Sequence, residues 1–213
     1  MILKINNLSK EFDSKIILNK VALTTKANAV LAIVGPSGSG KTTLLRCIAG
    51  LENYQGEIFF DDKLINSVPT AKRNIGLVSQ DLALFPHLTV WENIVYPLKI
   101  RKIKKEGIGL RVNNILEKLN IAEFKNKLPQ NISGGQQQRV AIARSLIYQP
   151  EVLLLDEPFA QLDQDLKTEL LGWLKQILHQ ESILTLFVTH DLEDAKYIGD
   201  NIIRISNTQI KML

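Results

Sequence analysis

One segment constrains this chain more than any other, the glycine-rich stretch Gly35-Pro36-Ser37-Gly38-Ser39-Gly40-Lys41-Thr42. It fits the pattern G-x-x-x-x-G-K-[ST], which is informative when a strand precedes it and a helix follows it. Here the apolar run Ala29–Val34 precedes it, and a helix is expected over Thr42–Ala49, with Gly50 placed to end that helix. Backbone N–H groups of such a turn converge on an anion at the helix N-terminus. The segment therefore predicts a phosphate-binding loop.

The side chains of the loop extend this interpretation. Lys41 is placed to reach the β- and γ-phosphates of ATP, and Thr42 offers a hydroxyl to Mg²⁺. We include the next residue, Thr43, among the nucleotide-binding residues. A chance glycine-rich turn is the alternative, and the strand and helix on either side argue against it.

A second chemical signal is the acidic end of the apolar run Val152–Leu155, where Asp156 and Glu157 follow in sequence. In an open parallel sheet, ligands bind at the carboxyl ends of the strands, so these carboxylates can share a site with the phosphate loop. Asp156 is predicted to hold Mg²⁺, and Glu157 to polarise an attacking water as general base. A polar turn after a core strand is the alternative.

Short apolar runs alternate with helical patterns, which favours an α/β fold. A further buried strand is expected at Leu184–Val188, and Gly56–Phe60, followed by Asp61 and Asp62, is expected to be a strand that enters a turn. Strands near Leu3–Leu8 and Ile16–Thr24 indicate an N-terminal antiparallel β layer. The 213 residues fit one domain, residues 1–213.

The middle of the chain has a different hydrophobic pattern from the α/β part. Residues 88–148 are mostly helical in pattern, and we interpret them as a helical lobe inserted into the α/β core. Within the lobe, Gly107 and Gly109 mark an expected loop.

Composition limits the class of protein. Hydrophobic residues make up 45% and charged residues 23% of the chain, as in ordinary globular proteins. The sequence has no run of 18 apolar residues and no visible secretory signal. The single cysteine, Cys47, fits a reducing compartment, so a cytoplasmic location is expected.

The net charge is +4, and the dense basic cluster comprises Lys99, Arg101, Lys102, Lys104 and Lys105. A solvated face is the first interpretation of this cluster. A contact with lipid headgroups or a partner is the second.

The family is indicated by Asn131–Arg139, which contains Ile132-Ser133-Gly134-Gly135-Gln136. It resembles the signature of ABC ATPases, whose usual form is Leu-Ser-Gly-Gly-Gln, with Ile132 replacing the leucine. Ser133 can cap the helix expected to follow, over Gln136–Leu146. The resemblance implies a P-loop NTPase core, a RecA-like sheet with flanking helices. It also implies a head-to-tail dimer, in which each ATP lies between the phosphate loop of one copy and Ser133, Gly134, Gly135 and Gln136 of the other.

Other residues match the family in order along the chain. Gln80 resembles the Q-loop glutamine, which contacts Mg²⁺ and the water. His190 resembles the H-loop histidine that contacts the γ-phosphate. Asp163 closes Ala160-Gln161-Leu162-Asp163, which resembles the D-loop, usually Ser-Ala-Leu-Asp. Phe12 resembles the aromatic residue that stacks on adenine, although a core role in the β layer is the alternative.

The segment Gln80–Ile94 looks like the Q-loop region of bacterial importer ATPases, where a helix of a membrane subunit docks. The resemblance implies permease subunits that dock near Gln80–Thr89, with Leu84, Phe85, Pro86 and Leu88 forming an apolar groove, unless these side chains pack internally. We therefore expect an ATP-hydrolysing importer subunit on the inner face of the cell membrane, with a substrate-capture protein as a further partner. An exporter subunit and a soluble switch acting on nucleic acid or ribosomes remain alternatives, although no nucleic acid is expected. The regulatory C-terminal β domain of many relatives is not expected.

Overall fold

The computed structural model describes residues 1–104 and 106–213, so Lys105 of the basic cluster lies outside the described residues. The chain divides into two compact units. The first, here called the sheet unit, comprises Met1–Leu77, Glu151–Glu157 and Leu171–Leu213. The second, here called the helical unit, comprises Val78–Pro150 and Pro158–Leu170.

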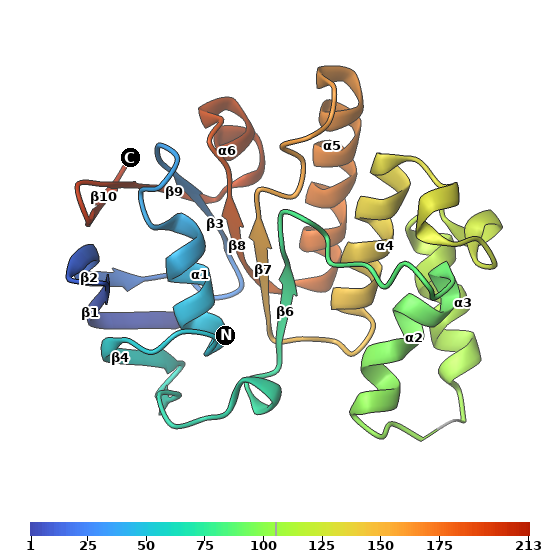
Figure 1. The fold of residues 1–213 in the computed structure, drawn as a ribbon, viewed down its shortest axis with the longest axis horizontal. Coiled ribbons are helices and arrows are strands. Elements are labelled where there is room, and N and C mark those ends of the chain that lie inside the picture. The colour runs from blue at the N-terminus through green and yellow to red at the C-terminus, as the bar shows by residue number, and fades with distance from the viewer. Residues whose placement is uncertain (105) are drawn as a thin grey trace. The chain divides into compact units, whose positions relative to one another are not determined.

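The larger sheet has six strands in the order β10-β9-β3-β8-β7-β6 (Figure 1). Strands β3, β7, β8 and β9 pair in parallel, and β10 pairs antiparallel with β9. The parallel pairing brings the carboxyl ends of β3, β8 and β7 to one edge of the sheet. The strand bounds are β3 Val30–Val34, β6 Ile75–Val78, β7 Val152–Asp156, β8 Leu184–Val188, β9 Asn201–Ser206 and β10 Gln209–Met212.

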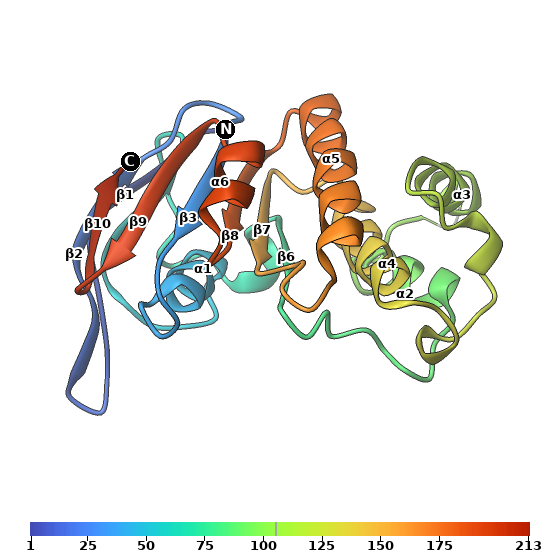
Figure 2. The ribbon, with the colours of Figure 1, turned by 90° about the horizontal axis from the view of Figure 1, so that it is seen from above.

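The fully buried runs β3, β7 and β8 lie where the sequence predicts them. Apart from Asp156 and Thr185 they are apolar, because helices cover both faces of the sheet. Leu31 and Ile33 share a core cluster with Leu44 and Ile48 of helix α1 (Lys41–Ala49). Ala32 packs instead with Ala195 of helix α6 (Leu192–Ile198). Alternate residues of β3 therefore face opposite helices, and Figure 2 shows α1 and α6 on the two sides of this sheet.

A second sheet is antiparallel, with the order β2-β1-β4-β5. Its bounds are β1 Leu3–Phe12, β2 Lys15–Thr24, β4 Gln55–Phe60 and β5 Lys63–Leu64. The predicted first strand ends at Leu8, whereas β1 continues to Phe12. It can do so because Asp13 and Ser14 both take positive φ, 46° and 65°, in the two-residue turn that twists the strands back on each other.

The helical unit contains α2 (Val90–Ile100), α3 (Ile108–Lys118) and α4 (Gly134–Leu146), and α2 packs on α4. Helix α5 (Gln164–Glu181) begins in this unit and ends in the sheet unit. The short 3₁₀ turns are η1 Thr70–Lys72, η2 Ala122–Phe124 and η3 Pro129–Asn131. Among the described residues, no helix is long and apolar enough to cross a membrane.

The prediction of a loop at Gly109 is wrong. Gly107 precedes α3 with φ of 81°, but Gly109 is the second residue of the helix. A glycine is tolerated there because the first N–H groups of a helix have no partner within the helix in any case.

Candidate functional site

The phosphate loop leaves β3 and enters α1 through two positions that require glycine. A Cβ on Gly35 would lie 2.4 Å from the carbonyl oxygen of Ile205 and 2.8 Å from Oγ of Ser39. Gly40 precedes α1 with φ of 101°, a conformation that L side chains rarely adopt. The close approach at Gly35 and the turn at Gly40 together hold the loop folded back over the start of α1.

The loop presents polar groups that lack partners of their own. Among the described residues, α1 has neither a side-chain cap at Gly40 nor an acidic residue in its first turn. The buried Oγ atom of Ser39, in the loop itself, also has no hydrogen-bond partner among the described residues. Buried polar atoms are normally paired, so an unpaired one inside this loop indicates a group that binds there. The uncapped helix end favours an anion.

Lys41 is a buried cation, only 5% exposed, whose side chain is hydrogen-bonded to the loop. Its Nζ atom donates to the carbonyl oxygens of Gly35 at 2.9 Å and Pro36 at 3.1 Å. The same atom lies 3.5 Å from Oε1 of Glu157. The ammonium group therefore stands between the loop and the acidic end of β7.

Asp156 ends β7 and is also buried, at 7% exposure. Burial raises the pKa of this carboxyl group, and the hydrogen bond from Thr42 Oγ1 to Asp156 Oδ1, 3.0 Å long, opposes the shift. The two oxygen atoms join the start of α1 to the end of β7. Hard oxygen donors of this kind suit Mg²⁺.

Glu157 follows in the left-handed region, with φ of 47°. Its backbone N–H donates to the carbonyl of Val188 at 3.0 Å, which fixes the turn beside β8. Its carboxylate lies between two groups, with Oε1 near Lys41 and Oε2 at 3.0 Å from Nδ1 of His190. A strained conformation held by such contacts is typical of functional positions.

His190 lies on the turn after β8, with its side chain 56% exposed. The turn is fixed on both sides of the histidine. Thr189 Oγ1 accepts from the N–H of Asp191 at 3.1 Å and donates to Asp194 at 3.3 Å. Asp191 caps α6 by accepting from the N–H of Glu193 at 2.8 Å. The backbone of His190 is thus held while its ring faces Glu157.

Phe12 stands at the end of β1 and is 42% exposed, so it is not a core residue of the β layer. The Nζ atom of Lys10 lies 4.3 Å from the centre of its ring. One face of an aromatic ring on an exposed hairpin is thus covered by a cation.

In the helical unit, Gln80 is exposed and begins a segment held by α4. Leu82 and Ala83 take positive φ of 58° and 43°. The guanidinium of Arg144 donates to both of their carbonyl oxygens, at 2.7 Å each. Arg144 therefore fixes the segment that follows Gln80.

The rest of that segment is held by Asn93, a fully buried residue of α2. Its Oδ1 atom accepts from the N–H of Phe85 at 2.9 Å. Its amide group donates to the carbonyls of Phe85, Leu88 and Thr89 at 3.0–3.1 Å. Phe85 also packs on Tyr96 with ring centres 4.5 Å apart, so part of the expected apolar groove is packed internally, whereas Pro86 is exposed.

The signature segment opens α4 with a capping box, which confirms the predicted cap. Ser133 Oγ accepts from the N–H of Gln136 at 3.4 Å, and Gln136 Oε1 accepts from the N–H of Ser133 at 2.9 Å. Gly134 is exposed and Gly135 is buried. A Cβ on Gly135 would lie 3.1 Å from Leu166, so this glycine allows the start of α5 to pack closely.

Asp163 has a structural role within the helical unit. Its Oδ1 atom accepts from the N–H of Leu166 at 3.0 Å, so it caps the start of α5. Gln80, Asp163 and the signature belong to the helical unit, whereas Lys41, Thr42, Asp156, Glu157 and His190 meet within the sheet unit.

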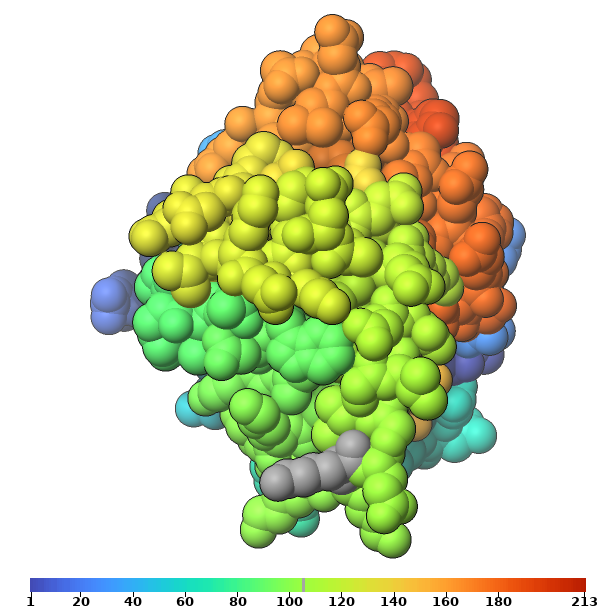
Figure 3. Space-filling view, turned by 90° about the vertical axis from the view of Figure 1, so that its right-hand side faces the viewer, coloured from blue at the N-terminus to red at the C-terminus, as the bar shows by residue number. Residues whose placement is uncertain are grey.

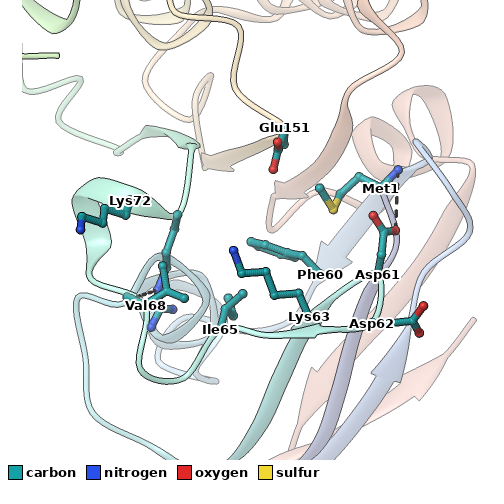
Figure 4. A pocket seen from close by; sticks show the side chains of 10 residues that line it. Met1, Phe60, Asp61, Asp62, Lys63, Ile65, Val68, Lys72 and Glu151 are labelled. Carbon is teal, nitrogen blue, oxygen red and sulfur yellow. Dashed lines mark hydrogen bonds and ion pairs between the residues drawn. The ribbon is translucent and has the colours of Figure 1, made fainter. Parts of the chain in front are cut away.

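A separate hollow of about 520 Å³ lies in the sheet unit beside β4 and β5 (Figure 4). Phe60, Lys63, Arg73 and Glu151 are among its lining residues. Within residues 1–104 and 106–213, its lining includes none of the site residues predicted from the sequence. The hollow is therefore distinct from the phosphate loop.

Sequence reasoning missed Arg73, which binds the end of α1, and Asn93 and Arg144, which hold the segment that follows Gln80. Arg73 is 6% exposed and donates to the carbonyls of Cys47 and Ile48 at the end of α1. A buried arginine beside a strand, or a buried asparagine on a helix, is the signal that could have drawn attention to these residues. The partners, however, are backbone carbonyls, which no side-chain pattern reveals.

Comparison with known proteins identifies the family. The sequence profile described as ABC transporter matches residues 18–160. The chain is 43% identical over 212 residues to the Fe(3+) ions import ATP-binding protein FbpC of Fusobacterium nucleatum, covering 99% of this chain and 57% of that protein. It is 44% identical over 207 residues to the spermidine/putrescine import ATP-binding protein PotA of Thermotoga maritima, covering 97% of this chain and 56% of that protein.

A solved structure agrees with these relatives. The dimeric, post-hydrolysis ATP-binding cassette MJ0796, bound to ADP and Pi, has a TM-score of 0.85 and 32% identity, covering 98% of this chain and 96% of that one. The predicted α/β P-loop fold is confirmed. The chain spans somewhat more than half the length of FbpC and PotA. With a profile match over most of its length and these relatives, the chain belongs to the ABC transporter family.

Proposed function

We propose that this chain binds ATP with Mg²⁺ and hydrolyses it. The observation that carries the proposal is the convergence of Lys41, Asp156, Glu157 and His190 at one edge of the sheet, beside an uncapped helix start. The N–H groups of the loop and the Lys41 ammonium would bind the phosphates. Phe12, exposed at its hairpin, would stack on the adenine.

The metal fits the donors present. Within the described residues, no group of three or more His, Cys, Asp or Glu side chains could hold a metal ion. Mg²⁺ typically takes one or two carboxylates and completes its shell with waters and substrate phosphates. Thr42 and Asp156 would hold it here, with Gln80 as a third oxygen donor. Bound Mg²⁺ would offset the charge of the phosphates.

Hydrolysis then depends on residues of this chain. Glu157 would accept the proton of the attacking water, because its carboxylate lies at the open edge of the sheet. His190 would orient that carboxylate and contact the γ-phosphate. Lys41 would exchange its bonds to the Gly35 and Pro36 carbonyls, and its contact with Glu157, for the phosphate oxygens.

We further propose that the chain forms a single ABC ATPase domain over residues 1–213, with the helical lobe of residues 88–148 inserted into its α/β core, and acts as a head-to-tail dimer. The MJ0796 cassette, solved as a dimer, supports this assembly. Ser133, Gly134, Gly135 and Gln136 of one copy would then contact the ATP of the other, and Asp163 would lie at the dimer contact. ATP-driven closure of that dimer would be the working step.

The working partners would be permease subunits that dock on the segment Gln80–Thr89. The relatives FbpC and PotA are import ATP-binding proteins, which favours an importer over an exporter or a soluble switch. The protein would then lie on the inner face of the cell membrane, where a substrate-capture protein serves the same complex. Affinity purification from detergent-solubilised membranes tests this: recovery of polytopic subunits supports it, and recovery of soluble partners or nucleic acid alone contradicts it.

A further inference from the structure

The end of α2 and the start of α3 carry the two most exposed large hydrophobic side chains among the described residues, and the turn after α2 adds a third. Leu110 is 72% exposed and Ile100 is 63% exposed, and Ile103 between them is 43% exposed. Exposed apolar side chains are ordinary one at a time. Three of them within eleven residues, around one turn, indicate a surface that contacts something else.

The C-terminal end of α2 is fixed by its own backbone. The N–H of Ile103 donates to the carbonyl of Leu98 at 3.0 Å, and the N–H of Lys102 donates to the carbonyl of Lys99 at 3.1 Å. Lys102 has φ of 54°. These are the two bonds and the left-handed residue of the Schellman motif that ends a helix. Lys99, Ile100, Lys102 and Ile103 therefore lie on a defined end of α2.

The same turn is strongly basic. Lys99, Lys102 and Lys104 are exposed, and the sequence from Asn93 to Lys104 contains no acidic residue. Arg101 is half-buried and stacks on Tyr148, with 3.9 Å between its guanidinium carbon and the ring centre. The three lysines thus provide the charge at the surface, while Arg101 anchors the turn to the helical unit.

Cations and apolar side chains alternate here over a projecting turn. The sequence reads Lys99-Ile100-Arg101-Lys102-Ile103-Lys104. In Figure 3 this segment lies at the lower edge of the face shown, where it projects. A projecting turn cannot enclose a partner helix, as a groove does. A bilayer interface suits it, because headgroup phosphates meet the lysines while the adjoining acyl region accepts the apolar side chains.

We propose that the surface made of Lys99, Ile100, Lys102, Ile103, Lys104 and Leu110, at the end of α2, the turn after it and the start of α3, is a docking surface for an anionic phospholipid bilayer. It binds the surface of the leaflet and does not insert a helix. The interaction is separate from the proposed ATPase function and needs neither nucleotide nor permease. It would orient the helical unit against the membrane.

Co-sedimentation with protein-free vesicles tests the proposal. The purified chain, without nucleotide, is mixed with vesicles of phosphatidylglycerol and phosphatidylcholine in equal parts, or of phosphatidylcholine alone. We expect binding to the anionic vesicles only, weakened by salt. Each lysine at an anionic surface contributes roughly a fivefold change in affinity, so the triple variant Lys99→Gln, Lys102→Asn, Lys104→Gln should lose at least about tenfold.

The matched control removes three exposed lysines elsewhere, in the variant Lys20→Asn, Lys26→Gln, Lys125→Gln. Lys20 has φ of 47°, close to that of Lys102, so asparagine replaces both. The control should bind within about twofold of the unmodified chain if local charge at the turn dominates. An equal loss in both triple variants would show that net charge alone acts, and would overturn the proposal.

A fluorophore places the contact. Cys47 is buried, so a dye coupled to a Leu110→Cys variant reports this turn alone. Its emission should shift to shorter wavelength with anionic vesicles and stay unchanged with neutral ones. No shift, or no sedimentation of the unmodified chain, contradicts the bilayer assignment and leaves a protein partner for this surface. ATP affinity of every variant, measured in parallel, should be unchanged, so failure here is distinct from failure of the proposed function.

Discussion

The Nδ1 atom of His190 lies 3.0 Å from Oε2 of Glu157, across the ends of two neighbouring parallel strands. The other carboxylate oxygen of Glu157 faces the ammonium of Lys41 at 3.5 Å. One carboxylate thus joins the turn after β8 to the phosphate loop after β3. In the proposed mechanism, a bound nucleotide would compete with this arrangement for Lys41, and its binding would free Glu157 to act on water.

The first prediction concerns Lys41. In Lys41→Ala, the nucleotide loses a charge-assisted contact, and ATP affinity should fall by roughly ten- to a hundredfold. Titration calorimetry with Mg²⁺-ATP measures it. Lys26→Ala, at an exposed lysine of the same unit, is the control and should bind normally. Unchanged affinity in Lys41→Ala would contradict the assignment of the phosphate loop.

The second prediction concerns Arg73, which binds the end of the helix that starts at the phosphate loop. Its guanidinium donates to Ile48 at 2.7 Å, to Cys47 at 3.2 Å and to Val68 at 2.9 Å. Arg73→Met leaves these carbonyls without their cation, so the free energy of unfolding should fall by about 2–4 kcal/mol. Urea unfolding measures this, with Arg204→Met as an exposed control. Equal stability of the two variants would contradict a capping role for Arg73.

The third prediction concerns Asn93, whose four hydrogen bonds hold the segment from Phe85 to Thr89. Asn93→Leu removes all four bonds and leaves buried backbone groups unpaired, so the chain should lose about 2–4 kcal/mol of stability. Hydrogen exchange should show faster exchange at the Phe85 amide. An unchanged exchange rate there would show that the segment is held by other contacts.

Some features of this structure can be predicted from the sequence, and others cannot. Pattern alone predicts three features: the strand before the phosphate loop, the acidic strand end and the cap at Ser133. Each of them depends on neighbours within a few residues along the chain. Arg73 reaches back 25 residues to Ile48, and Arg144 reaches back 62 to Leu82. A side chain that binds a distant carbonyl leaves no local period, so it cannot be predicted in this way.

The error at Gly109 has the opposite origin. Glycine is a poor helix former in the middle of a helix, and the prediction treats each glycine as a break. The first turn of α3 carries little of that penalty, so the helix begins at Ile108.

The position of the Glu157 side chain could not be predicted from the sequence either. Its contact with both Lys41 and His190 depends on a backbone turn with positive φ, which glutamate rarely adopts.

The fourth prediction concerns pH and Cys47. Burial raises the pKa of this thiol to about 11, from an ordinary value of 9.0. A raised folded-state pKa contributes stability that is present below the unfolded value and is lost as pH rises toward the folded value. The chain should therefore lose up to about 2 kcal/mol of stability between about pH 9 and pH 11 through this group.

The variant Cys47→Ala isolates the effect of the thiol. Urea unfolding at about pH 7 and about pH 10.5 should show a smaller decline for the variant than for the unmodified chain. All other side chains are the same in the two proteins, so the difference between the two declines reports the thiol. Parallel declines would mean that the thiol does not contribute.

The most direct test of the proposed chemistry is the steady-state ATP hydrolysis of Glu157→Gln, measured together with its ATP affinity. Glutamine keeps the shape of the side chain but cannot accept a proton from water. Turnover should fall by about a hundredfold or more, while ATP binding persists and a closed dimer accumulates in size-exclusion chromatography. Near-normal hydrolysis by Glu157→Gln would contradict the assignment of Glu157 as the general base.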